Sequence, residues 1–311
     1  NQAAASLTAG TLVRAGVSNA TLALMIRGDQ KLALQATGAV DLSLGNGFAS
    51  ARANEVGIAF NNTGAEVDRT VSVSIGDTTI AAPLRVADKT ASLTVTGLTA
   101  TVGGFVTLSG NFGIQKTFGA TAVDDELWVV STGAAASLTA GSAIRVGVKD
   151  ASLALLIRGD QKLALQASGA VDLSLGAGFA SATATSVSVV FNNTGVDQDR
   201  VLTVALGTRT ISAALKAVDN TTVVSMEGLS AQVGGFVSLG GNFGFRKQGE
   251  DIQVVAQGAS ALLTAGGVEV GVKAADLALL LPAQGGVQFQ ASGTPVLTLP
   301  TAFASVSVAK V

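Results

Sequence analysis

The chain repeats itself, and this internal repetition constrains the fold more than any other feature of the sequence. Residues 19–51 and 150–182 match at 28 of 33 positions, with Asn19 aligned to Asp150. A third copy begins near Ile252, which aligns with Leu127, and it follows at a shorter spacing because the preceding loop is shorter. A regular internal period is typical of one structural unit used several times in succession. The predicted copies span residues 1–126 (nearly complete), 127–251 (complete) and 252–311 (truncated).

The boundaries between the copies show no sequence pattern typical of a flexible linker. No Pro-rich or Ser-rich stretch separates them, so we expect the copies to abut in one continuous body. The chain begins at Asn1 without a Met and shows no signal peptide, so we expect the natural N-terminus to lie further upstream.

Within each copy, apolar residues alternate with small or polar residues. Residues 71–75 read Val-Ser-Val-Ser-Ile and residues 93–96 read Leu-Thr-Val-Thr, which is typical of β-strands with one buried face. Tight turns such as Gly76-Asp77 favour antiparallel hairpins, because glycine supplies the positive φ that a short loop needs. Further glycines interrupt the strand patterns and predict bends or bulges. These are Gly38, Gly45, Gly97 and Gly103.

These patterns define the expected fold class. We predict an all-β protein that forms an elongated tandem-repeat array, built mainly from antiparallel β-hairpins. Solenoid-like stacking is one way in which the copies could pack on each other. The abundance of Ala and Gly indicates thin, closely packed layers. Each copy would leave apolar surface at its ends, and the next copy would cover that surface.

Charge and residue types exclude several classes of function. The formal net charge is −2 and no basic run exists, which argues against a nucleic-acid partner. The chain contains neither His nor Cys, so the common catalytic triads and thiol nucleophiles are absent. The apolar stretch at residues 151–157, like the others in the chain, is too short for a transmembrane helix. We therefore expect no enzyme, no bound cofactor and no transmembrane segment.

Clustered acidic residues are the only candidates for a metal site. Ca²⁺ prefers several oxygen ligands, and carboxylates gather in two places, although neither place has a recognisable Ca²⁺-loop pattern. The alternative interpretation is a solvated loop whose charges discourage edge pairing. The candidates are Asp124, Asp125 and Glu126 in one segment, and Asp197 and Asp199 in the other.

Two further motifs have a functional and a structural interpretation. Residues 27–29 and 158–160 spell the integrin-binding tripeptide Arg-Gly-Asp at a predicted hairpin tip. The third copy has Ala-Gln-Gly-Gly at residues 283–286 instead, so the architecture does not need the tripeptide and we interpret it as a polar turn. The glycine-rich residues 102–105 and 110–113 are similar to phosphate-binding loops, but no helix follows them, so we interpret them as strand bends.

One set of segments resembles the repeats of very large bacterial surface or secreted proteins, which are described as adhesin-like. The segments are Gly103–Val106, Leu108–Lys116, Ala151–Ile157 and Asn192–Gly195. The resemblance covers nearly the whole chain and implies export, an extracellular or cell-surface location and a structural role. It supplies no catalytic residue.

The sequence therefore favours a structural or adhesive surface fibre that associates with further copies of the repeat, with a cell surface or matrix as its other partner. The alternative is a stalk or binding module for a glycan, ice or Ca²⁺. Trp128 is the single Trp, and Gln253 stands in its place in the third copy, which gives little support to a glycan platform. A β-helical enzyme acting on polysaccharide is the third hypothesis.

Overall fold

The computed structural model describes most of the chain, with short gaps between the described segments. The described residues are 3–9, 13–45, 48–141, 144–176, 179–206, 209–299 and 306–307.

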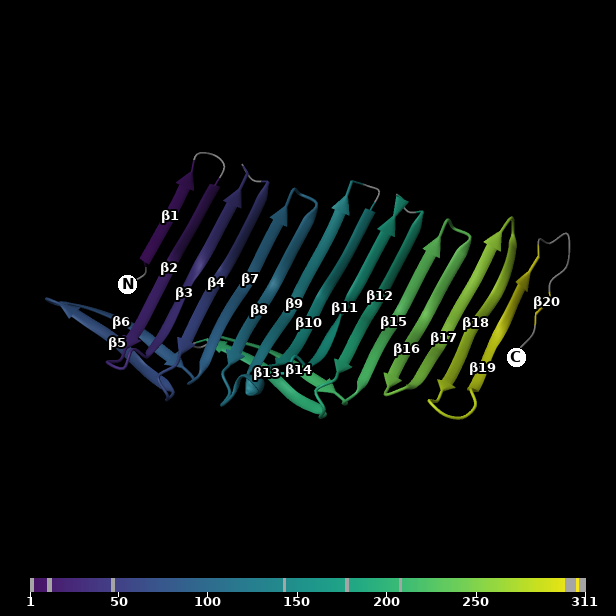
Figure 1. Ribbon diagram of the computed structural model, residues 1–311. Coiled ribbons are helices and arrows are strands. Elements are labelled where there is room, and N and C mark those ends of the chain that lie inside the picture. Colours follow the sequence, from purple (N-terminus) through teal and green to yellow (C-terminus); the bar gives the residue numbers. More distant parts are fainter. Residues whose placement is uncertain are drawn as a thin grey trace. The chain divides into compact units, whose positions relative to one another are not determined.

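Nearly all of the described chain is β-strand, and the described strand pairs are antiparallel. One sheet contains 16 strands in the order β1-β2-β3-β4-β7-β8-β9-β10-β11-β12-β15-β16-β17-β18-β19-β20. Two further sheets are the two-stranded hairpins β5–β6 and β13–β14 (Figure 1). The all-β class and the antiparallel hairpins predicted from the alternating sequence are confirmed.

The strand boundaries recur with the period of the sequence. β2 to β8 and β10 to β16 start and end at equivalent positions, to within a residue, when the two copies are aligned with Asn19 on Asp150. The bounds in the first copy are β1 Ala3–Ala9, β2 Val13–Ile26, β3 Leu32–Leu44, β4 Ala49–Asn61, β5 Val67–Ile75, β6 Thr78–Val86, β7 Thr90–Val102, β8 Val106–Thr117 and the 3₁₀ turn η1 Ala122–Asp124. In the second copy they are β9 Glu126–Ala140, β10 Ile144–Arg158, β11 Leu163–Leu175, β12 Ala180–Asn192, β13 Gln198–Leu206, β14 Arg209–Ala217, β15 Thr221–Val233 and β16 Val237–Gln248. In the third they are β17 Asp251–Ala265, β18 Val268–Leu281, β19 Gln288–Thr298 and β20 Val306–Ser307.

The hairpins β5–β6 and β13–β14 do not belong to the large sheet. In the large sheet β4 is therefore next to β7, and β12 is next to β15. β5–β6 is inserted between β4 and β7, and it contacts β2, β3 and β4. The described hydrophobic clusters lie where the hairpins pack against the large sheet. The hairpins thus form a second layer over part of one face.

A buried asparagine forms hydrogen bonds at both ends of the first hairpin. The Asn61 side-chain amide donates to the backbone oxygens of Ala65 and Val86, each 2.9 Å away. Its Oδ1 accepts hydrogen bonds from the backbone N–H and the hydroxyl of Thr63, at 2.9 and 2.8 Å. Ala65 precedes β5 and Val86 ends β6, so one side chain fixes where the hairpin leaves the sheet and where it returns.

The second copy repeats this arrangement. The buried Asn192 amide donates to two backbone oxygens at 2.9 and 2.8 Å, and its Oδ1 accepts from Thr194 at 2.9 and 2.8 Å. The repeated Asn-Asn-Thr-Gly motif, at residues 61–64 and 192–195, is therefore the base of each hairpin.

The interior glycines have two distinct positions. Gly97 has a φ of +60° and sits where the β7–β8 register shifts, and its N–H donates to Asn111 Oδ1 at 2.8 Å. Gly38 also adjoins a register shift, between β3 and β4. Gly45 and Gly103, with φ values of +62° and +59°, lie in turns just beyond the ends of β3 and β7. The first pair matches the bulges predicted from sequence, whereas the second pair forms turns.

The chain divides into two compact units that do not follow the copy boundaries. Unit 1 consists of residues 1–136, 151–165 and 199–216, and unit 2 consists of residues 137–150, 166–198 and 217–311. Most of hairpin β13–β14 belongs to unit 1 although its sequence belongs to the second copy. Both described hydrophobic clusters lie in unit 1, whereas Val255, Leu263 and Phe289 of unit 2 are exposed.

Candidate functional site

The larger of the two described buried clusters of unit 1 lies between hairpin β13–β14 and the large sheet. One face of the hairpin consists of apolar side chains that are fully or nearly buried, and the sheet meets it with small or branched apolar residues. The hairpin contributes Leu202, Val204, Ile211, Ala213 and Leu215, and the sheet contributes Val130, Ala154, Leu156 and Ala164. This alternation places one face of the hairpin on the sheet and leaves Val201, on the other face, 61% exposed.

Glycines on the sheet make room for this hairpin. A Cβ added to Gly57 would lie 1.8 Å from Leu206 Cδ2. A Cβ added to Gly113 would lie 2.8 Å from Val204 Cβ and 3.0 Å from Val130 Cγ2. Neither glycine has a positive φ, so their role is close approach between the two layers.

The end of the hairpin reaches the base of the preceding hairpin. Leu206 belongs to the same buried cluster as Val67, Leu84 and Val86 of β5–β6. Its partners from the large sheet include Ala23 and Ala59. Consecutive hairpins are therefore in contact, the end of one with the base of the one before it.

A polar group borders this interface beside Trp128, the single tryptophan. The indole N–H donates to Glu126 Oε2 at 2.9 Å, and Arg200 of the hairpin bonds to Glu126 Oε1 at 3.0 Å. The Arg200 guanidinium also lies 5.5 Å from the Trp128 ring centroid. Trp128 packs against the buried cluster, so it serves the interface and is only partly available to solvent.

The first group of candidate Ca²⁺ ligands is divided among different partners. Asp124 Oδ2 accepts hydrogen bonds from the hydroxyl and N–H of Thr121, at 2.7 and 3.2 Å. Asp125 forms an ion pair with Lys116 at 2.8 Å. Glu126 bonds to Trp128 and Arg200 as described above.

The second group is divided in the same way. Asp197 accepts the N–H of Asp219 at 2.7 Å, and Asp199 lies 3.4 Å from Lys216 Nζ. Among the residues that the structure describes, no group of three or more acidic, His or Cys side chains is arranged to hold a metal ion. Ca²⁺ binding by the five acidic residues stays a prediction.

Asp125 is held in its charged form. The Lys116 ammonium that bonds to it holds the pKa of this carboxyl below its ordinary value of 3.8. The Gly119 N–H, which donates to Asp125 Oδ1 at 3.0 Å, lowers the pKa further. This carboxylate therefore anchors the loop that joins the first copy to the second.

The two Arg-Gly-Asp turns share an ion pair between Arg and Asp, which in the second turn joins Arg158 Nε to Asp160 Oδ1 at 3.8 Å, but they differ in their other contacts. In the first, Arg27 Nε lies 3.7 Å from Asp29 Oδ1, and Arg27 also donates to the Thr63 carbonyl at 3.1 Å. In the second, the Gly159 N–H donates to the Asp125 carbonyl at 2.8 Å, and a Cβ on Gly159 would lie 1.8 Å from the Ala122 oxygen. The second turn is thus packed against the loop between the copies.

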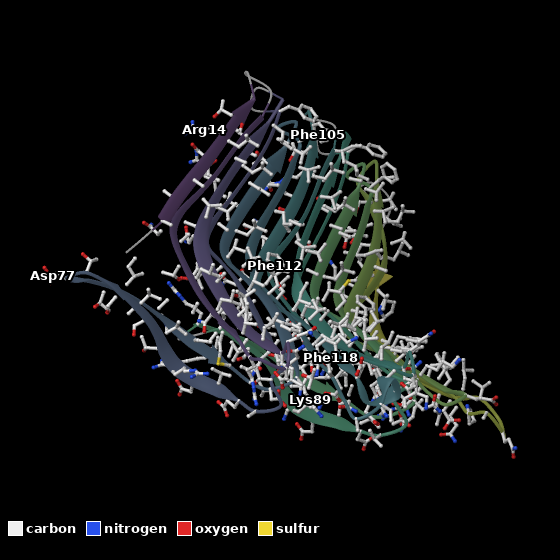
Figure 2. The ribbon with its side chains drawn as sticks, turned by 60° about the vertical axis from the view of Figure 1, so that its left-hand side comes forward. Arg14, Asp77, Lys89, Phe105, Phe112 and Phe118 are labelled. Atoms are coloured by element: carbon white, nitrogen blue, oxygen red, sulfur yellow. The ribbon has the colours of Figure 1, made fainter. Side chains whose placement is uncertain are left out.

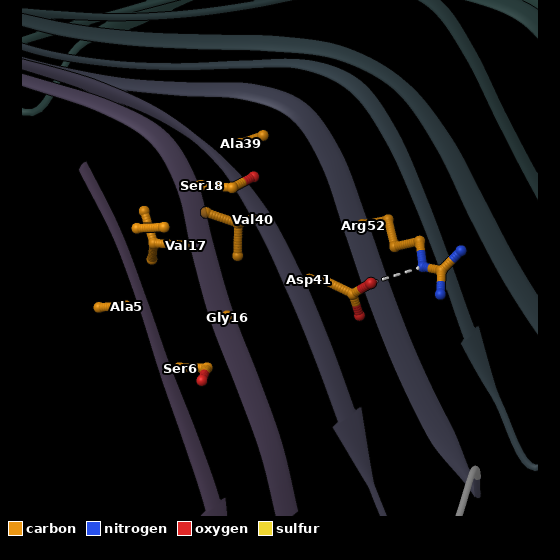
Figure 3. A pocket seen from close by; sticks show the side chains of 10 residues that line it. Ala5, Ser6, Gly16, Val17, Ser18, Ala39, Val40, Asp41 and Arg52 are labelled. Carbon is orange, nitrogen blue, oxygen red and sulfur yellow. Dashed lines mark ion pairs between the residues drawn. The ribbon is translucent and has the colours of Figure 1, made fainter. Parts of the chain in front are cut away.

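The concave surfaces are shallow grooves on the sheet. One of about 540 Å³ lies over β1 to β4, where Arg52 Nε and Asp41 Oδ2 form an ion pair at 3.0 Å among small side chains (Figure 3). Another of about 450 Å³ in unit 2 is lined by Gln253, Gln288 and Gln290 together with apolar residues such as Val255 and Phe289. Each groove therefore combines small or apolar side chains with several polar ones on an open sheet surface.

Comparison with known proteins does not assign the chain to a family. No protein family, no curated protein and no solved structure matches this chain. In the described part of the chain, no helix is long and apolar enough to cross a bilayer.

Proposed function

We propose that this chain is a structural protein whose repeated copies build a continuous antiparallel sheet, and that it extends an extracellular or cell-surface fibre. The observation that carries the proposal is the junction between the second and third copies. β16 ends the second copy and β17 opens the third, and they pair from Val237 opposite Leu263 to Gln248 opposite Asp251. The boundary between copies is thus an ordinary hairpin.

The same type of pairing joins strands inside a copy. β15 and β16 pair from Thr221 opposite Gln248 to Val233 opposite Val237. Because backbone hydrogen bonds cross the copy boundary as they cross the interior, a chain can grow by whole repeats without linkers. The resemblance of the repeats to adhesin-like bacterial proteins supports export and a surface location, and we assign the chain no catalytic step.

Electron microscopy of a length series tests this function. The series comprises the present chain, a chain with residues 20–150 inserted again after Asp150, and a chain with residues 20–150 deleted. We expect particle length to change by a constant increment per copy, and regular filaments at high protein concentration. Compact particles whose size does not follow copy number would contradict the proposal, and loss of filaments on adding a chelator would favour Ca²⁺ binding at the acidic loops.

A further inference from the structure

The two hairpins occupy equivalent positions in the repeat but have different surroundings. Val204 of β13 is 0% exposed, whereas its counterpart in the first copy, Val73 of β5, is 58% exposed. Ile211 of β14 is 3% exposed, whereas its counterpart Ile80 in β6 is 46% exposed. The hairpin of the first copy therefore exposes the apolar pair that the hairpin of the second copy buries.

The exposed pair continues a face that already packs on the sheet. Val73 is paired across the hairpin with Ile80, and Val71 is paired with Ala82. Val71 and Ala82 pack against the buried cluster of unit 1, and side chains two residues apart on a strand share a face. Figure 2 shows the remainder of this hairpin leading away from the sheet strands to Asp77 at its tip.

The strands that bury the second hairpin explain the difference. Val204 meets Gly113 of β8 and Val130 of β9, as the close approach at Gly113 shows. β1, at Ala3–Ala9, corresponds to residues 134–140, so the part of β9 that carries Val130 has no counterpart among the described residues on this side of the sheet. Where the second hairpin contacts β8 and β9, the first hairpin instead has a groove of about 290 Å³ beside Ile80.

We propose that the Val73–Ile80 face of hairpin β5–β6 docks on a further copy of the repeat, joined in tandem on the β1 side of the sheet. The occupied surface would be the counterpart of β8 and β9, with a glycine and a valine equivalent to Gly113 and Val130. The proposal is supported by the equivalent face of hairpin β13–β14, which already packs on β8 and β9. The inference deepens the proposed structural function and rests on it, since it names what the exposed hairpin contacts.

The expected contact is apolar at Val73 and Ile80, and its charged border differs from that of the second hairpin. Arg209 near the end of the second hairpin lies 3.6 Å from Glu55 of β4. Thr78 replaces Arg209 in the first hairpin, so this ion pair has no counterpart there. The Arg200–Glu126 pair at 3.0 Å does have a counterpart, because Arg69 of the first hairpin is equivalent to Arg200. One charge pair is therefore expected at the border of the contact, and added salt should weaken docking only through that pair, because screening leaves apolar contacts largely unchanged.

Thiol labelling tests the inference cleanly because the chain has no native cysteine. Val73→Cys is introduced into the present chain and into an extended chain in which residues 90–131 are fused ahead of Asn1. This fusion keeps the register of the repeat, since Asn1 is the counterpart of Thr132. Ser72→Cys, on the exposed face of the same strand, is the matched control. Val204→Cys reports whether the known interface has folded.

We expect the Val73→Cys thiol to react at least about tenfold more slowly in the extended chain, because a buried thiol reacts only through opened states. Ile80→Cys should behave in the same way, while Ser72→Cys should react equally fast in both chains. Equal reactivity of Val73→Cys in the two chains, with Val204→Cys protected in both, would overturn the inference. Protection that grows with protein concentration in the present chain would also overturn it, by pointing to a second molecule. The electron microscopy series tests the structural function independently, so either hypothesis can fail alone.

Discussion

At the scale of single residues, the hairpin bases depend on two buried asparagines. Asn61 and Asn192 each use both amide hydrogens and accept two hydrogen bonds at Oδ1. Buried backbone oxygens need such partners, because water cannot reach them. A short polar side chain thus sets the direction of a whole hairpin.

Replacing Asn61 tests this role. Asn61→Ala should lower the free energy of unfolding by about 1–3 kcal/mol, because it leaves buried backbone groups without a partner. Urea denaturation measures the change. Asn62→Ala is the control: Asn62 is exposed and its Oδ1 accepts a hydrogen bond from the Leu32 N–H at 2.8 Å, so its loss should cost clearly less. Equal costs for the two variants would argue against the proposed role of Asn61.

Acid should weaken the loop between the first and second copies. Since Lys116 and Gly119 lower the pKa of Asp125 in the folded chain, the charged carboxylate stabilises the fold above the ordinary pKa of 3.8. That contribution is lost as the pH falls through the lowered pKa. Wild type should therefore be more stable than Asp125→Asn at pH 7, and the difference should vanish in strong acid. Denaturation curves at a series of pH values would show a constant difference if the idea is wrong.

At the scale of elements, the hairpin–sheet interface supplies the described apolar core of unit 1. The strands of the large sheet carry Ala and Gly where the hairpin lies, so the two layers approach closely. Dispersion contacts and apolar burial are then gained along the whole hairpin face. The small residues that dominate the composition have their clearest role here.

The two faces of β13 should differ sharply in their response to truncation. Leu202→Ala should lower the free energy of unfolding by about 2–5 kcal/mol, because a fully buried leucine leaves a cavity. Val201→Ala, on the exposed face of the same strand, should change stability by no more than about 0.5 kcal/mol. Thermal or urea unfolding of both variants distinguishes a packed hairpin from a loosely attached one, for which the two costs would be similar.

A matched glycine pair tests the close approach between layers. Gly113→Ala should destabilise the chain by about 1–3 kcal/mol, because the new methyl group meets both Val204 and Val130. Gly244 is its counterpart, where an added Cβ lies 2.9 Å from Val255 Cγ2 and the 51%-exposed Val255 can move aside. Gly244→Ala should therefore cost much less. Equal effects in urea denaturation would mean that hairpin packing does not set the requirement for Gly113.

At the scale of the whole molecule, the repeat determines how the chain can be lengthened. Equivalent strands recur in the first and second copies, and a hairpin of ordinary register joins the second copy to the third. Each added copy would bring one further hairpin and one further stretch of sheet to receive the next hairpin. Stability in such arrays is close to a sum over copies and their interfaces.

Unfolding should follow this additivity. A chain with residues 20–150 inserted again after Asp150 should show an m value in urea about 1.4-fold that of the present chain if it unfolds in one transition, because m scales with the surface exposed. Two resolved transitions, with an m value for the first that is unchanged by the insertion, would show that the copies unfold independently.

The candidate sites were only partly predictable from sequence. The Asn-Asn-Thr-Gly motif recurs visibly in the sequence, but its role depends on Val86, which lies 25 residues from Asn61. Similarly, the acidic run at residues 124–126 gave no sign that its carboxylates have separate partners. One of those partners, Arg200, lies 74 residues away from Glu126. Contacts of this kind follow from the path of the chain and leave no local pattern.

The sequence by itself determined the all-β class, the antiparallel hairpins and the repeat. Those features rest on signals that are local or strictly periodic: alternating apolar residues, glycine-containing turns and the regular spacing of the first two copies. Only the tertiary structure decided which hairpins leave the sheet and lie on it. It also decided that Val204 is buried while the equivalent Val73 is exposed. The physical reason is that burial depends on strands brought together from distant parts of the chain, so equivalent residues of two copies can meet different neighbours.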